Sequence, residues 1–153
     1  MEENTMQAAQ DPTVLRLNNY AKEFLKETAK WAYFLAIMGF IGIGLIVVIA
    51  LFAGVIFSAI PTDANPYGGI GGGVVTVIYL IIGGLYFFPV LYLYRFANKM
   101  KIALARNDED VLTNAFEYLK SHYKFIGIFT IVMMSFYLLM FLIALVGGLA
   151  AAI

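Results

Sequence analysis

His122 is the only histidine of the chain and the first candidate for acid–base or metal chemistry. The chain has no cysteine, and Glu117 is not spaced to share a tetrahedral metal with His122. A general base would also need a nucleophile on the same face. We therefore interpret His122 as a charge near the end of a short helix. We expect no catalytic residue, no metal site and no cofactor.

Two other patterns approach known binding motifs without matching them. Asp108, Glu109 and Asp110 place three carboxylates in a row, but they lack the alternate spacing of a calcium loop. Carboxylates are instead favoured in the first turn of a helix. The glycine-rich residues 68–73 are not followed by the Lys-Ser/Thr pair of a phosphate-binding loop. We interpret the acidic run as helix-capping charge and the glycines as a turn.

Charged side chains inside an apolar span usually mark a transport path, since each costs about 2.5–3.5 kcal/mol on insertion scales. The apolar stretches of this chain, residues 31–60, 70–94 and 125–153, contain none. Their hydroxyl groups are expected to bond to their own helix or to a neighbouring helix. These hydroxyls belong to Thr76, Tyr79, Thr130, Ser135 and Tyr137. The pattern argues against a coupled transporter and against an intramembrane enzyme.

The composition requires a lipid environment. Of the 153 residues, 62% are apolar and 13% are charged, against about 45–50% and about 25% in soluble domains. A soluble fold of this size could not bury so much apolar surface. The net charge is zero, which gives no electrostatic argument for nucleic acid as a partner.

The elements that must carry these residues are helices. We expect an all-α, polytopic membrane domain with three transmembrane helices, over residues 31–60, 70–97 and 125–153, because about 20 apolar residues cross a bilayer. The first apolar stretch starts too late and is too long for a cleavable signal peptide. Residues 61–69 contain proline, glycine, asparagine and aspartate, which predicts a tight outer loop between the first two spans.

The N-terminal segment precedes the first span. Residues 1–10 have no periodicity and are expected to be disordered. Residues 11–30 begin with Asp11-Pro12, a typical helix start, and repeat apolar residues at helical spacing. They predict an amphipathic helix that lies either on the membrane surface or against the protein's own loop.

The segment 98–124 separates the second and third spans. Residues 98–105 are expected to continue the second helix, and Arg106-Asn107-Asp108 to break it, with Asn107 or Asp108 as the N-cap of a new helix. That new helix is predicted to be short, amphipathic and too polar to span the membrane. Its apolar face would carry Leu112, Phe116 and Leu119.

Glycine and proline shape the second span. Gly83, Gly84 and Pro89 predict a bend, because proline removes a backbone N–H and clashes with the preceding turn. The bend would be either static or a hinge.

Small residues four positions apart occur twice and predict close packing between helices. One row is Ala50, Gly54 and Ser58, and the other is Ala144, Gly148 and Ala152. We expect the two rows to face each other within one chain. The alternative is that one row binds an oligomer or a larger complex.

The basic residues predict the orientation. Four of the ten Lys and Arg residues lie in residues 1–30 and six in residues 95–124, whereas residues 61–69 and the C-terminus have none. The positive-inside rule then places the N-terminus and the segment 98–124 in the cytoplasm. Three spans place the C-terminus in the periplasm.

Three strings resemble a family of small bacterial integral-membrane proteins that is described only as a domain of unknown function. They are LKETAKWAYFLAIMGFIGIGL, YFFPVLYLYRFANKMKIAL and FEYLKSHYKFIGIFTI, and the likeness extends over residues 21–146. The resemblance implies the three-span architecture and a bacterial inner membrane. It assigns no catalytic residue.

From these patterns we expect a non-enzymatic structural or accessory subunit that works by helix association. Its partners would be the lipid bilayer and either a homo-oligomer or a larger membrane complex. The alternative is a small oligomeric channel or passive transporter, whose axial path would be lined by Thr76, Tyr79 and Thr130.

Overall fold

The computed structural model describes residues 17–59 and 72–152, and these residues form three long α-helices and no strand. The helices are α2 (Asn19–Ala59), α3 (Gly72–Arg106) and α4 (Glu109–Ala152). At 1.5 Å per residue, even the 35 residues of α3 extend about 50 Å. The hydrocarbon core of a bilayer is about 30 Å thick, so every helix has length to spare.

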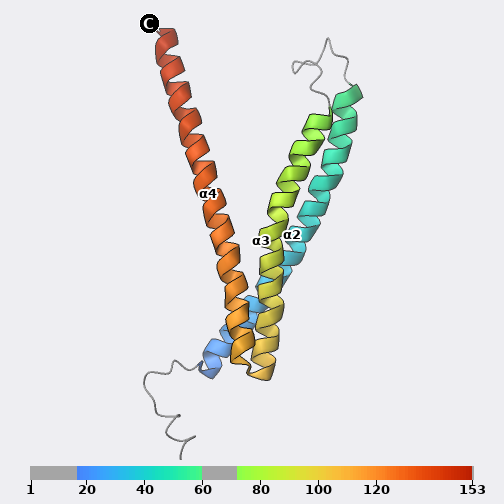
Figure 1. The fold of residues 1–153 in the computed structure, drawn as a ribbon, viewed down its shortest axis with the longest axis vertical. Coiled ribbons are helices and arrows are strands. Elements are labelled where there is room, and N and C mark those ends of the chain that lie inside the picture. The colour runs from blue at the N-terminus through green and yellow to red at the C-terminus, as the bar shows by residue number, and fades with distance from the viewer. Residues whose placement is uncertain (1–16, 60–71, 153) are drawn as a thin grey trace, which may run out of the picture.

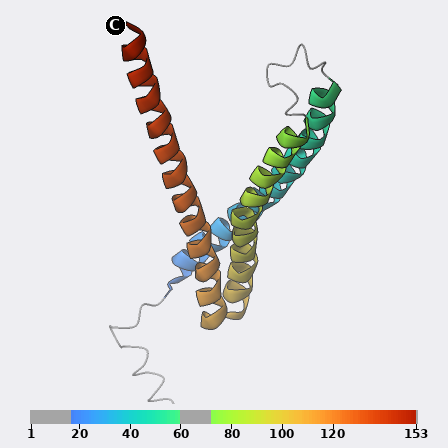
Figure 2. The ribbon, with the colours of Figure 1, turned by 45° about the horizontal axis from the view of Figure 1, so that its top comes forward.

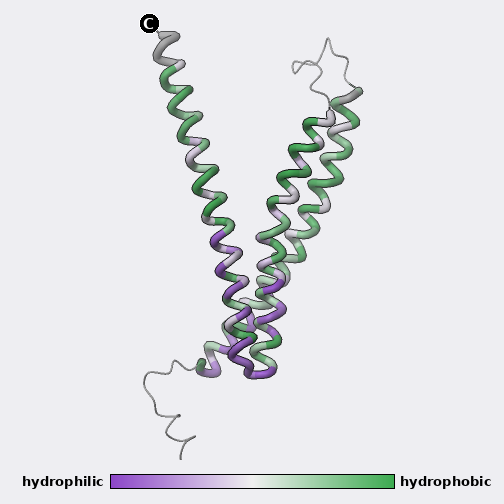
Figure 3. Tube along the Cα trace, in the orientation of Figure 1, coloured by the Kyte–Doolittle hydropathy of each residue, from purple (hydrophilic) through white to green (hydrophobic). Residues whose placement is uncertain are grey.

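The spare length of all three helices lies at one end of the molecule. Figure 3 shows the hydrophilic residues of α2, α3 and α4 gathered at that end, with apolar residues along the rest. We call this end the polar base and define it as residues 19–30, 95–106 and 109–124. Helices α2 and α3 run antiparallel from the base, and α4 turns back from the end of α3 (Figure 1).

The main buried core lies at the level of the polar base. Its members are Ala29, Ala32, Phe96, Ala97, Met100 and Ala115, which come from all three helices. Four of the six are alanines, so the helix backbones can approach closely. Phe96 and Met100 of α3 are the largest fully buried side chains and fill the space between the helices.

Beyond the base, α4 separates from the other two helices. Figures 1 and 2 show α2 and α3 remaining side by side while α4 diverges. Over the described residues α3 packs against both other helices, but no Cα atom of α2 comes within 8 Å of α4. Residues 134–147 of α4 are all exposed. The far part of α4 therefore has no partner in the described chain.

A two-residue turn joins α3 to α4. Asn107 has a φ of 51°, in the left-handed region that asparagine tolerates better than most residues. The N–H of Asp108 donates to the Ala103 carbonyl at 3.1 Å, and the Asp108 carboxylate accepts from the Val111 N–H at 3.0 Å. The first bond closes α3 by a Schellman motif and the second caps α4. The predicted break is confirmed, and Asp108 is the N-cap.

The prediction of a separate short helix within residues 98–124 is wrong. Helix α4 continues without interruption from Glu109 into the third apolar stretch and has 44 residues. A change from polar to apolar residues does not end a helix, because only lost backbone hydrogen bonds or capping groups do so. The sequence has no proline near Lys124, and Gly127 lies inside α4 and does not end it.

The same reason applies at the N-terminal end. Residues 19–30 are the first turns of α2 and not a separate amphipathic helix. The Asn18 side chain caps α2 by accepting from the Ala21 N–H at 2.7 Å. The predicted helix start at Asp11-Pro12, the predicted disorder of residues 1–10 and the predicted loop 61–69 all concern residues outside the described part of the chain.

Pro89 lies inside α3, which continues through it. Figure 2 shows α3 changing direction about halfway along its length. Gly83 is buried and Gly84 is exposed. The assignment of this change of direction to Gly83, Gly84 and Pro89 stays a prediction, as does the choice between a static bend and a hinge.

Candidate functional site

His122 makes a contact that the sequence did not indicate. It lies well inside α4, and its Nδ1 is 2.8 Å from the carbonyl oxygen of Pro89 in α3. A carbonyl can only accept a hydrogen bond, so Nδ1 must carry the proton and donate it. In the neutral ring, Nε2 is then the acceptor. The interpretation of His122 as a charge at the end of a short helix is wrong, because no helix ends there.

An apolar cavity of about 120 Å³ adjoins this hydrogen bond, at the place where α3 and α4 begin to diverge. Residues of both helices line it: Leu85, Tyr86, Pro89, Val90, Leu93, His122, Phe125, Ile126 and Phe129. Tyr86 and Phe129 lie edge to face across it, with ring centroids 5.8 Å apart. His122 is the one strongly polar member of this lining, and it belongs to the polar base.

Cations of the base lie over aromatic rings of neighbouring helices. Lys101 Nζ is 3.9 Å from the centroid of the Tyr33 ring in α2. The Arg95 guanidinium is 5.6 Å from the centroid of the Tyr118 ring in α4. Lys22 Nζ donates to the side-chain oxygen of Asn107 at 2.7 Å. These contacts connect α3 to both other helices and tie the α3–α4 turn to α2.

The first row of small residues packs against the start of α3. Ala50 and Gly54 are buried, and a Cβ added at Gly54 would collide with the Thr76 hydroxyl. That hydroxyl lies 3.0 Å from the Ala50 carbonyl and 2.9 Å from the Gly72 carbonyl. Close approach of the two backbones thus depends on small residues in this part of α2.

The expectation that the two small-residue rows face each other is wrong. In the second row Ala144 is exposed, and α4 has moved away from α2 at this level (Figure 1). The side chains of Ser58, Gly148 and Ala152 lie outside the described part of the structure. The two rows lie at a similar distance from the base, but they do not pack against each other, because α4 diverges from α2.

The predicted apolar face of residues 109–124 is shifted around the helix. Leu112 and Leu119 pack partly buried against the core of the base, but Phe116 is 44% exposed. Ala115 occupies the fully buried position instead. The helices are close enough here that the smallest apolar side chain faces the contact, and the largest one lies beside it.

The expectation that hydroxyl groups of the apolar stretches bond to helix backbones is confirmed for Thr76 and Ser135. Ser135 donates to the Ile131 carbonyl at 2.8 Å, and Thr76 contacts carbonyls of its own helix and of α2. Tyr79 and Thr130 are exposed on different helices. In residues 17–59 and 72–152 no group of three His, Cys, Asp or Glu side chains could hold a metal ion.

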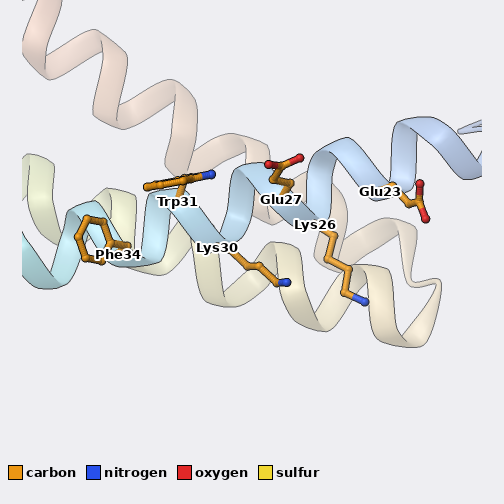
Figure 4. A pocket seen from close by; sticks show the side chains of 6 residues that line it. All are labelled: Glu23, Lys26, Glu27, Lys30, Trp31 and Phe34. Atoms are coloured by element: carbon orange, nitrogen blue, oxygen red, sulfur yellow. The ribbon is translucent and has the colours of Figure 1, made fainter.

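A shallow groove runs along one exposed side of α2 near the base (Figure 4). Its lining alternates acidic and basic side chains and then becomes aromatic: Glu23, Lys26, Glu27, Lys30, Trp31 and Phe34. The rings of Trp31 and Phe34 meet edge to face, with centroids 6.0 Å apart. This change from charged to aromatic side chains is typical of a helix that leaves water and enters a bilayer.

These observations define a class: an all-helical protein whose three described helices are each long and apolar enough to cross a membrane. The chain belongs to the family of unknown function DUF5362, whose model matches residues 67–145, just over half of the chain. The matched part contains α3, the turn and most of α4. No curated protein and no solved structure has significant similarity to the chain. The membership confirms the resemblance to a family without an assigned activity.

Proposed function

We propose that this protein is a non-enzymatic membrane protein that works by assembling with other transmembrane helices through α4, as a homo-oligomer or as an accessory subunit of a larger complex. The observation that carries this proposal is the exposure of residues 134–147 on all sides of α4. The far part of the third apolar helix therefore packs against no other helix of the described chain.

The distribution of contacts supports this role. The base joins all three helices through a buried core and so keeps α4 at a set angle to the α2–α3 pair. Lipid tails are as apolar as leucine, so helices in a membrane associate by close packing and hydrogen bonding. A splayed helix carrying small residues, including Ala144 and Gly148, offers such packing to another helix.

The absence of buried polar chemistry in the described residues supports a role without catalysis. No polar or charged side chain is buried among them. Preorganised polar groups in a water-excluded site are the usual source of catalytic rate enhancement. We therefore propose that the activity of the protein is binding, with the bilayer and other membrane helices as its partners and no cofactor.

We further propose a bacterial inner-membrane location with the base in the cytoplasm. Nine of the ten Lys and Arg residues of the chain lie in the base as defined above, and the tenth, Arg16, precedes it. The positive-inside rule places such a segment on the cytoplasmic side. The N-terminus is then cytoplasmic, and the C-terminus and residues 61–69 are periplasmic.

Cysteine labelling tests this orientation, because the chain has no cysteine of its own. Asp63→Cys is expected to react with a membrane-impermeant maleimide in intact spheroplasts. Glu117→Cys, exposed in the base, is expected to react only after the membrane is permeabilised. Labelling of Glu117→Cys in sealed spheroplasts would contradict the orientation, and equal labelling of both variants would contradict an odd number of crossings between them.

The assembly proposal is tested with the small residues of α4. The double variant Ala144→Leu/Gly148→Leu should leave the base intact and block close approach of another helix. We expect the wild-type protein, extracted in mild detergent, to have a light-scattering mass above that of one chain. The double variant should fall to the mass of one chain with an unchanged melting temperature.

Val146→Leu is the matched control, because it adds apolar volume to the same helix on a different face. It is expected to keep the wild-type mass. A wild-type protein that is monomeric and brings no other chain with it from its native membrane would contradict assembly. A loss of mass in the control as large as in the double variant would show that bulk, and not the small residues, governs assembly.

A further inference from the structure

We propose that the cavity between α3 and α4 is a binding site for one anionic phospholipid, with an acyl chain in the cavity and the phosphate on Arg95. The inference requires the membrane placement of the helices but not the assembly of α4. It rests on the apolar lining of the cavity, on its position at the edge of the base and on the cation over Tyr118, which is one helical turn from His122 of that lining.

The cavity has the chemistry of an acyl-chain site. Above His122 its lining consists of aromatic and aliphatic side chains, and its volume of about 120 Å³ corresponds to a short stretch of hydrocarbon. It is formed by α3 and α4 at the point where they diverge (Figure 1). A chain that enters it can therefore continue upward between the two helices without leaving the apolar zone.

The headgroup end of the site is defined by Arg95. Its guanidinium lies over the Tyr118 ring of α4, and Tyr118 is one helical turn below His122 on the same face. The backbone of Tyr118, whose ring Arg95 contacts, is thus about 6 Å farther toward the base than that of His122, measured along the axis of α4. This is the direction in which the glycerol and phosphate of a lipid must lie if its acyl chain occupies the cavity.

Arg95 can bind phosphate while it remains on Tyr118. The guanidinium carbon is 5.6 Å from the ring centroid, and the contact with the ring uses none of the N–H donors of the guanidinium. The side chain is exposed, so a phosphate can reach these donors. Arginine binds phosphate in a bidentate manner that lysine cannot reproduce. The bond between His122 and Pro89 joins α4 to α3 beside the cavity, since both residues belong to its lining.

Tryptophan quenching by brominated lipid tests the site. The chain has one tryptophan, Trp31, and Trp31→Phe removes its signal. Phe129→Trp in that background places the reporter in the cavity, and Phe141→Trp places a reference on the same helix at a position that is 63% exposed. Both proteins are reconstituted in phosphatidylcholine vesicles with a minor fraction of either brominated phosphatidylglycerol or brominated phosphatidylcholine.

At the cavity reporter, quenching by brominated phosphatidylglycerol should correspond to a local fraction of this lipid roughly fivefold above its fraction in the vesicle. This ratio corresponds to a binding preference of about 1 kcal/mol for the anionic lipid. Brominated phosphatidylcholine should show no enrichment at either reporter. Arg95→Gln should abolish the enrichment, whereas Lys120→Gln, which removes an exposed cation of α4 at similar depth, should retain it. Ile126→Phe, which fills the cavity and leaves Arg95 in place, should also abolish it.

Equal quenching by the two lipids at the cavity reporter would overturn the proposal. Enrichment that survives both Arg95→Gln and Ile126→Phe would overturn it as well, because the lipid would then be bound elsewhere. Absence of all quenching at the Phe141→Trp reference would instead overturn the membrane placement of α4, and the lipid site with it.

Discussion

Replacing Phe96 by alanine is expected to lower the free energy of unfolding by about 3–5 kcal/mol, the usual cost of removing a buried aromatic ring. Phe96 is 1% exposed and touches the core of the base, to which all three helices contribute. The base projects beyond the apolar spans, so water is available there and the hydrophobic effect operates in full. Loss of the ring should therefore weaken the contact that holds α4 to α2 and α3.

Phe116→Ala is the matched control, since it removes the same ring from the same end of the molecule. Phe116 is 44% exposed, so its loss should cost less than about 1 kcal/mol. Both variants are compared with the wild type by denaturant titration in mild detergent, with the fluorescence of Trp31 as the signal. Equal destabilisation by the two substitutions would contradict the position of the core described here.

Gly54→Leu is expected to have the second large effect. A Cβ at this position would collide with the Thr76 hydroxyl and come within 3.2 Å of the Gly72 carbonyl. The carbonyl cannot retreat without moving α3, because it is backbone, and the hydroxyl can turn away only by giving up its bond to the Ala50 carbonyl. Overpacking of this kind costs about 1–3 kcal/mol, and loss of the Thr76 bond adds about 0.5–1.5 kcal/mol.

The expected result for Gly54→Leu is a lower melting temperature in detergent and a separation of the far ends of α2 and α3. A distance between spin labels on these two helices would measure that separation. Gly44→Leu in the same helix is the control, because no described atom lies within 4 Å of a Cβ added there. If Gly44→Leu and Gly54→Leu destabilise the protein equally, close packing at Gly54 is not what holds the pair together.

Local features of the chain were sufficient to predict the helices and their interruption. The three apolar stretches, the proline inside α3 and the Arg106-Asn107-Asp108 break all act through the backbone within a few residues. The ends of the polar segments were predicted less well. Polarity changes at residues 30 and 124, but a helix ends only where capping or backbone bonding changes, and α2 and α4 continue through both positions.

The faces used for packing were decided by tertiary structure. In the spans nearly every residue is apolar, so no periodicity marks the face that meets another helix. Two rows of small residues were equally good candidates by spacing, yet among the members whose burial the structure describes, Ala50 and Gly54 pack against α3 and Ala144 is exposed. In the base Phe116 was predicted to lie on the apolar face of the helix, whereas the close approach of the helices leaves it 44% exposed and buries Ala115.

The composition and the distribution of basic residues are sufficient to predict a helical protein for an apolar solvent, with its Lys and Arg residues on one side of the spans. The divergence of α4 and the bond between His122 and Pro89 came only from the tertiary structure. That bond joins residues 33 positions apart, and its partner is a backbone carbonyl, which every residue has. The angle of α4 also depends on tertiary packing. Water drives the three helices together at the base, whereas lipid exerts no such force on their apolar ends.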